Sequence, residues 1–230
     1  MRGTPLALRK RLLVECHSQT PKKKSALLLK KTLRASEQER LDIAQAREAW
    51  AEFQKTLDPN RLVFLDESGV KTNMTRLYGR ALKGARCHDA APHGHWEAVT
   101  VLSSIRLNGT TECIVFAGAV ERKMFDAYVR SMLAPALRPG DVVIMDNLSV
   151  HKSQAACDAI QARHAECLFL PAYSPDLNPI EKMWSKVQQI LRGIKARTNE
   201  DLVAGVGEAL DRVSANDAQG WFRSCGYIQS

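Results

Sequence analysis

Two aspartates occupy the same kind of position in the sequence, directly after a short apolar run. Asp66 closes the run 61–66 and Asp146 closes the run 140–146. In open α/β sheets, ligand crevices form at the C-terminal ends of the buried strands. Two carboxylates on neighbouring strands repel each other unless one is protonated or a cation lies between them. Mg²⁺ removes that conflict, because it takes carboxylate and phosphate oxygens as ligands. A single such aspartate is explained by capping a turn, but the repeated ending favours a metal site.

A third acidic residue, Glu181, follows the proline-rich segment 171–179. Asn178 suits the N-cap of a helix and Pro179 suits its first position, which makes Glu181 the third helical residue. A capping box would then explain Glu181 without any chemistry. From the local sequence alone, capping and metal binding remain equally open for this residue.

The elements that must position these carboxylates follow an α/β pattern. Strands are predicted where short apolar runs occur, and a hairpin is predicted around Asn108-Gly109. The predicted strands are 61–66, 96–106, 111–120, 140–146 and 166–170, and the predicted helices are 123–137, 152–164, 180–192 and further helices from about residue 199. A hairpin followed by strands that alternate with helices predicts a mixed sheet covered by helices.

The N-terminal part differs from the rest in charge and pattern. The net charge is +8, and residues 1–35 hold ten Lys or Arg against Glu15 alone, so the remainder is close to neutral. We expect residues 1–35 to be a weakly structured basic arm whose partner is a polyanion such as DNA, although a solubilising tail is the alternative. Residues 36–60 form a linking segment: Ser36-Glu37-Gln38-Glu39 has the pattern of a capping box before an amphipathic helix over roughly 37–57.

Cysteine usage and hydropathy predict a cytoplasmic protein. The six cysteines contain no C-x-x-C pair, which suits reduced thiols better than a disulfide framework. No apolar run reaches the roughly 18 to 20 residues of a membrane span, and basic residues interrupt the early apolar patch that a secretion signal would need. Cys87, His88, His93 and His95 lie close together and suggest zinc as an alternative, but a polar loop is the preferred interpretation.

Three segments resemble, in order, the DDE triad of transposases, in the branch of bacterial insertion-sequence transposases related to the mariner elements. The segments are Val63-Phe64-Leu65-Asp66-Glu67-Ser68-Gly69, then Gly140-Asp141 through Asp146-Asn147-Leu148-Ser149-Val150-His151-Lys152, then Tyr173-Ser174-Pro175-Asp176-Leu177-Asn178-Pro179-Ile180-Glu181 with Trp184. Between Asp146 and Glu181 lie 34 residues, the spacing of that branch. The resemblance runs from about Ser36 to the C-terminus.

The resemblance implies a ribonuclease H-like fold for residues 61–230, with a mixed five-strand sheet in which the first and fourth strands are neighbours. Asp66 would lie beside Asp146, and Glu181 would reach over from the helix after the fifth strand. These three would hold two Mg²⁺ (or Mn²⁺) ions for cleavage and strand transfer. The implied partner is double-stranded DNA, as transposon ends and target, bound by a homodimer.

Members of this family usually carry helix-turn-helix modules ahead of the catalytic domain, and this sequence has a basic arm in their place. A separately encoded catalytic subunit, a frameshift partner and a truncated copy remain open as explanations, and the first of these implies a separate helix-turn-helix subunit as partner. Two other functions compete with the transposase. One is a non-catalytic fragment that binds DNA or a full-length transposase and modulates it, and the other is a general metal-dependent nuclease on the same fold.

Several residues near the three carboxylates have weaker assignments. Glu67 should point to the face opposite Asp66 and not bind metal. His151 is either a phosphate contact or an ordinary loop histidine, and Asn147 and Asn178 either orient carboxylates or cap, with capping favoured for Asn178. Trp184 is expected in the core. The candidate DNA contacts are Lys22, Lys23, Lys24, Lys30, Lys31, Arg76, Arg80, Lys83, Arg86 and His151.

Overall fold

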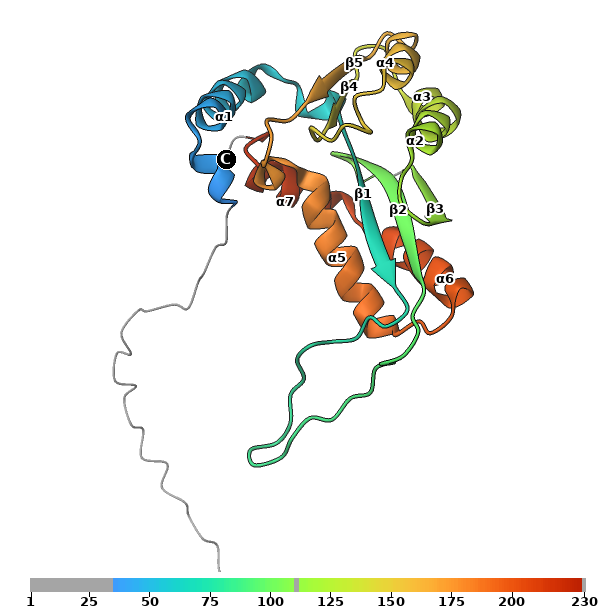
Figure 1. The fold of residues 1–230 in the computed structure, drawn as a ribbon. Helices are drawn as coiled ribbons and strands as arrows, with labels where there is room; N and C mark the ends of the chain where they lie inside the picture. Colours follow the sequence, from blue (N-terminus) through green and yellow to red (C-terminus); the bar gives the residue numbers. More distant parts are fainter. Residues whose placement is uncertain (1–34, 110–111, 229–230) are drawn as a thin grey trace, which may run out of the picture. The chain divides into compact units, whose positions relative to one another are not determined.

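The computed structural model describes residues 35–109 and 112–228. Their centre is a five-stranded sheet in the order β3-β2-β1-β4-β5 (Figure 1). The strands are β1 (Leu62–Lys71), β2 (Ala98–Arg106), β3 (Cys113–Ala117), β4 (Val142–Met145) and β5 (Glu166–Phe169). The basic arm predicted at residues 1–35 lies outside the described residues apart from Ala35, and so do its five candidate DNA contacts, Lys22, Lys23, Lys24, Lys30 and Lys31.

The sheet is mixed, as predicted. β1 pairs antiparallel with β2, and β2 pairs antiparallel with β3, which forms the predicted hairpin. β1 also pairs parallel with β4, and β4 with β5. In the β1–β4 register Leu65 pairs with Met145, so the residues that follow this pair are the two candidate aspartates, Asp66 and Asp146. The first and fourth strands are therefore neighbours, as the resemblance implied.

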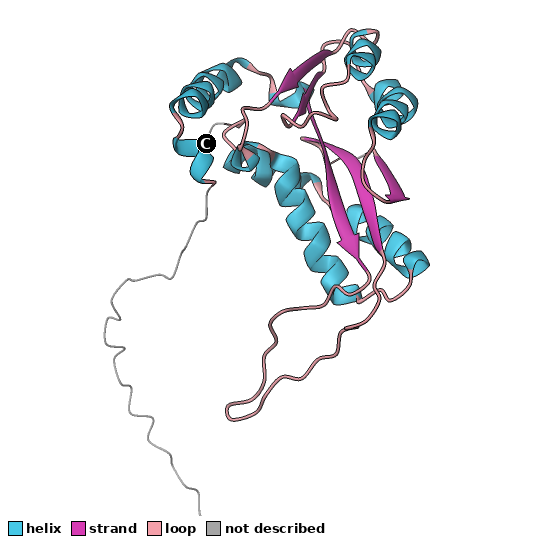
Figure 2. Ribbon diagram, viewed as in Figure 1, coloured by secondary structure: helices cyan, strands magenta, loops and turns pink. Residues whose placement is uncertain are grey.

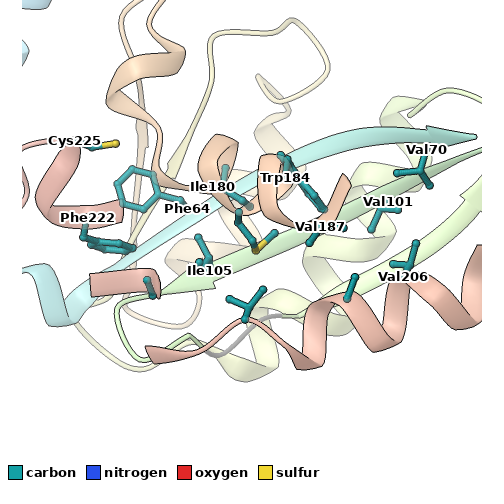
Figure 3. Close-up of a cluster of buried hydrophobic side chains, with 14 of the residues drawn as sticks. Phe64, Val70, Val101, Ile105, Ile180, Trp184, Val187, Val206, Phe222 and Cys225 are labelled. Carbon is teal, nitrogen blue, oxygen red and sulfur yellow. The ribbon is translucent and has the colours of Figure 1, made fainter. Parts of the chain in front are cut away.

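Helices cover both faces of the sheet (Figure 2). Side chains alternate along β1, because successive residues of a strand point to opposite faces. Leu62 and Phe64 pack in one cluster with α5 (Pro179–Ile194), α6 (Asn199–Asp211) and α7 (Ala215–Ser224). Figure 3 shows part of this cluster, in which Trp184 is buried as predicted. Val63 and Leu65 pack in a second cluster, and it contains residues of α2 (Arg122–Tyr128) and α4 (Gln154–Gln161).

The first helix differs from the prediction. Ser36–Glu39 is a 3₁₀ turn, and α1 runs from Leu41 to Phe53 rather than over 37–57. Arg40 is extended and occupies the N-cap of α1, so Ser36 lies too early to cap it. The Ser36 hydroxyl donates to the carboxylate of Glu37 instead, and the predicted capping box is wrong.

The helix predicted at 123–137 is interrupted. After α2 the chain passes through a π-helical turn, Val129–Leu133, and ends in the short α3 (Ala134–Ala136). Pro135 has no backbone N–H to donate, so a regular α-helical ladder cannot run through this position. Within residues 35–109 and 112–228, no helix has the length and apolar character that a membrane span would need.

Candidate active site

The two aspartates lie together at the point where β4 ends. Asp146 directly follows β4, whereas β1 continues past Asp66 to Lys71. The prediction that Asp66 ends its strand is therefore wrong. β2 is long enough to pair with β1 as far as Lys71, while β4 stops at Met145. Asp66 is consequently buried inside the sheet, 6% exposed, at the edge that β4 leaves open.

Glu181 comes from the first turn of α5 and lies within electrostatic reach of both aspartates. The pKa of Asp66 is raised to about 8, mainly by burial and then by the charges of Glu181, Asp146 and Glu67, in that order of importance. Desolvation also raises the pKa of Glu181, and the charges of Asp146 and Glu67 add to the effect. The fold thus gathers four carboxylates whose negative charges oppose one another.

These carboxylates do not form a closed metal-binding cluster. In the described part of the chain, no three His, Cys, Asp or Glu side chains are arranged closely enough to hold a metal ion. The donor set nevertheless fits a hard divalent cation, because it consists of carboxylate oxygens and contains no thiolate. A cation between the carboxylates would also favour the ionised form of Asp66, which burial and like charges disfavour.

Asn178 holds Asp66 in place. It occupies the N-cap of α5, but its side chain makes no cap hydrogen bond. Its amide Nδ2 donates to Oδ2 of Asp66 (3.0 Å), while the backbone N–H of Glu67 donates to Oδ1 (2.8 Å). The side chain of Asn178 therefore orients a carboxylate, and the capping role favoured from the sequence is wrong.

The same contact has two consequences. The capping box that would have explained Glu181 is absent, because the Asn178 side chain accepts nothing from the first turn of α5. In addition, Oδ1 of Asn178 is buried and has no hydrogen-bond partner among the described residues. A buried acceptor without a partner beside three carboxylates is a position that a cation or its water can occupy.

His151 is fully buried and links two carboxylates. Its Nδ1 lies 2.5 Å from Oδ1 of Asp146, and its Nε2 lies 2.8 Å from Oε2 of Glu67. Although burial lowers the pKa of His151, the hydrogen bonds to Asp146 and Glu67 outweigh it and raise the pKa to about 9. A side chain with no exposed surface and both ring nitrogens engaged cannot contact a phosphate, so that prediction for His151 is wrong.

Glu67 lies where the strand alternation predicted. It shares the face of β1 on which Val63 and Leu65 pack, opposite Asp66. Sequence reasoning missed its hydrogen bond to His151. The sequence held a signal only for the contact of His151 with Asp146, because these residues lie five apart across a turn, which allows the imidazole to fold back onto the carboxylate.

A pocket of about 470 Å³ opens beside the carboxylates. Its walls are the turn after β4, which carries Asp146, Asn147 and Lys152, and the segment 170–178 before α5; Glu181 also lines it. Asn147 is exposed here, and within the described residues its side chain makes no hydrogen bond to a carboxylate. Two of the candidate metal ligands, Asp146 and Glu181, therefore line the same pocket as the exposed Lys152.

Helix α1 braces one wall of this pocket. The guanidinium of Arg47 donates to Oγ of Ser174 (2.6 Å) and to both carboxylate oxygens of Asp176 (3.0 and 2.7 Å). Arg47 is only 20% exposed, and this bidentate geometry is the strong form of such a pair. The segment that leads into α5 and Glu181 is therefore tied to α1.

The long connection between β1 and β2, residues 72–97, extends away from the sheet (Figure 1). Exposed apolar side chains accompany its basic residues, with Tyr78 90% exposed and Leu82 87%. Cys87, His88, His93 and His95 are exposed there and, within the described residues, belong to no metal-binding group. The four candidate DNA contacts on this connection, named here the basic loop residues, are all exposed: Arg76, Arg80, Lys83 and Arg86.

A mixed five-stranded sheet in this order, with acidic residues where β1 and β4 lie side by side and in the helix after β5, defines a ribonuclease H-like domain. Residues 61–203 match the family described as "DDE superfamily endonuclease". The match covers more than half of the sequence, and the chain belongs to this family.

Named relatives agree with this assignment. The Tcb2 transposase of Caenorhabditis briggsae is 32% identical over 91 residues, which is 40% of this chain and 32% of that protein. The Tc1 transposase of Caenorhabditis elegans is 36% identical over 73 residues, which is 32% of this chain and 27% of that protein. The matched segments therefore span about a third or less of these curated relatives.

Solved structures show the same fold. A paired-end complex of the Mos1 transposase with its left transposon end is similar with a TM-score of 0.69 at 16% identity, covering 87% of this chain and 64% of that one. The catalytic domain of the Mos1 mariner transposase is similar with a TM-score of 0.56 at 14% identity, covering 86% of this chain and 93% of that domain. The predicted ribonuclease H-like fold is confirmed.

Proposed function

We propose that the chain is the catalytic part of a transposase, which cleaves DNA strands at the ends of an insertion sequence and transfers them to a target. The observation that carries this proposal is the convergence of Asp66, Asp146 and Glu181 in a chain of the DDE family. We assign these three as ligands of two Mg²⁺ or Mn²⁺ ions. Mos1 transposase, which shares the fold, has structures named with Mn and with Mg.

The bound ions would activate the attacking hydroxyl and stabilise the departing oxygen of an in-line displacement at phosphorus. The protein contributes hydrogen bonds that orient the carboxylates toward the ions. Within the described residues, hydrogen bonds to Asp146 reach only Oδ1, from the backbone N–H of Leu148 (3.0 Å) and from His151, which leaves Oδ2 for a cation. Each oxygen of Asp66 accepts one hydrogen bond and keeps a second lone pair.

The DNA would lie across the pocket beside Asp146 and Glu181. Lys152, exposed on the pocket wall, can approach a phosphate there, and the four basic loop residues can follow the backbone further away. These contacts are independent of base sequence. Recognition of the element's ends is assigned to a separate helix-turn-helix half, and the active assembly to a homodimer on DNA.

Strand cleavage tests the proposal. The full chain, with the helix-turn-helix half added, is incubated with duplex DNA carrying the element's ends in Mg²⁺ or Mn²⁺. The wild-type chain should nick at the ends, and Asp146→Ala should lose at least about 1000-fold in rate, on the order of one lost electrostatic contact to the transition state. Asp158→Ala is the matched control, because this aspartate is exposed on α4 and bonds to Gln154.

Three outcomes would count against the transposase. Equal cleavage by the wild type and Asp146→Ala would show that Asp146 is not a catalytic metal ligand. Binding to DNA or to a full-length transposase without cleavage under any condition would support the non-catalytic fragment. Uniform cutting of unrelated duplexes would support a general metal-dependent nuclease instead.

A further inference from the structure

We infer that His151 and Glu67 are a positioning pair, in which Glu67 orients the imidazole and the imidazole orients the Asp146 carboxylate for metal binding. The inference rests on the proposed function and deepens it. Glu67 lies on the face of β1 opposite Asp66, and among the described residues its side chain is hydrogen-bonded to the site through His151.

The open edge of β1 makes this link possible. β4 ends at Met145, which pairs with Leu65, so no β4 residue lies beside Asp66 and Glu67. The turn after β4 crosses this place instead. It is closed by the backbone N–H of His151, which donates to the carbonyl of Leu148 (3.2 Å), and this turn brings the imidazole to both carboxylates.

Packing holds the ring in one orientation. The His151 side chain has no exposed surface, and its ring lies 4.8 Å from the ring of Phe125, centroid to centroid, on α2. With the ring plane set by Phe125, its two nitrogens point at oxygens of Asp146 and Glu67. The ring can neither flip nor tilt without breaking at least one of these hydrogen bonds.

Asp146 needs such a constraint more than Asp66 does. Asp66 is buried within a strand, whereas the Asp146 side chain is 35% exposed at the start of a turn. Fixing Oδ1 of Asp146 with His151 and the Leu148 N–H defines the direction of Oδ2. Loss of a residue that hydrogen-bonds to a metal ligand and orients it typically lowers metal affinity or activity by about 10- to 100-fold.

Mn²⁺ binding to the full chain tests the pair directly, measured by electron paramagnetic resonance without DNA. His151→Ala should weaken Mn²⁺ binding about 10- to 100-fold, and Glu67→Ala about tenfold. His151→Asn should retain much of the affinity, because the asparagine amide can reproduce the donor at the Nδ1 position while losing the contact to Glu67. Glu166→Gln, at an exposed glutamate on β5, is the control and should bind as the wild type does.

The decisive comparison combines the variants. If Glu67 acts only through His151, adding Glu67→Ala to His151→Asn should cause no further loss of Mn²⁺ affinity. Independent losses in the double variant, or wild-type affinity in Glu67→Ala, would overturn the inference. If His151→Ala does not fold, the variants at Glu67, which is 23% exposed, carry the same test.

Cleavage with Mn²⁺ separates this inference from the proposed function. The pair predicts that the single variants lose kcat or metal affinity while KM for DNA stays unchanged, which a general loss of structure would not produce. A wild-type chain that neither binds Mn²⁺ nor cleaves DNA would refute both the proposed function and the inference. A wild type that does both, beside unaffected variants, would refute the inference alone.

Discussion

Replacing Asp66 by asparagine should stabilise the metal-free protein while it abolishes catalysis. The pKa of Asp66 is raised from 3.8 to about 8, by burial first and then by the charges of Glu181, Asp146 and Glu67. Between these two pH values the folded chain holds a proton that the unfolded chain releases. The contribution of Asp66 to the stability of the wild type therefore falls as pH rises through this window, and this contribution levels off above pH 8.

The size of the effect follows from the shift. One pKa unit corresponds to about 1.4 kcal/mol. Compared with a side chain that does not ionise, Asp66 therefore lowers the free energy of unfolding by about 1.5 kcal/mol at pH 5 and by about 4 kcal/mol at pH 7. Asp66→Asn removes this penalty. The new amide can still accept from the Glu67 N–H, and it can donate to Oδ1 of Asn178, which lacks a partner among the described residues, once the Asn178 amide turns over.

Urea unfolding in the presence of EDTA measures this effect for the wild type and Asp66→Asn at pH 5 and pH 7. The variant should be more stable by at least about 2 kcal/mol at pH 7, and its advantage should shrink at pH 5. Asp158→Asn, at an exposed carboxyl on α4, controls for the loss of one negative charge. A variant that is less stable than the wild type at pH 7, or an advantage that does not grow with pH, would refute the assigned environment of Asp66.

Three further predictions address metal, DNA and the pocket wall. Added Mn²⁺ should raise the Tm of the wild type at pH 7.5 and leave that of Asp66→Asn unchanged, as read by calorimetry; equal shifts would place the ion elsewhere. Replacing the four basic loop residues by alanine should weaken DNA binding and reduce the slope of log K against log salt by up to about 3.6, and an unchanged slope would exclude them as phosphate contacts. Arg47→Ala should lower the free energy of unfolding by about 1 to 2 kcal/mol in urea melts and slow cleavage, because the segment before α5 loses its bidentate anchor; full activity would show that this brace is unnecessary.

The sequence predicted most of the sheet because its strands contain short apolar runs. It predicted that Asp66 and Asp146 each follow an apolar strand, and the family resemblance made these strands neighbours, which the register of Leu65 with Met145 confirms. It did not predict how far β1 continues, because that length depends on pairing with β2 over residues 66–71. The family resemblance supplied the strand order, which local patterns alone leave open.

The contacts behind the carboxylates were harder to predict. Asn178 has the sequence of an N-cap, but tertiary structure brings Asp66 within reach of its amide, and that contact replaces the cap. His151 has the sequence of an exposed loop residue, but the turn after β4 buries it against Phe125. Both outcomes depend on residues more than 20 positions away in the chain, which local sequence patterns cannot reveal.

The proposed chemistry requires that Asp66, Asp146 and Glu181 share divalent cations. Crystals of the full chain grown in Mn²⁺, with anomalous diffraction recorded at the manganese absorption edge, would test it most directly. We expect anomalous peaks within about 2.0 to 2.6 Å of oxygens from all three side chains. Peaks bound elsewhere, or crystals saturated with Mn²⁺ that show none beside Asp66, would contradict it.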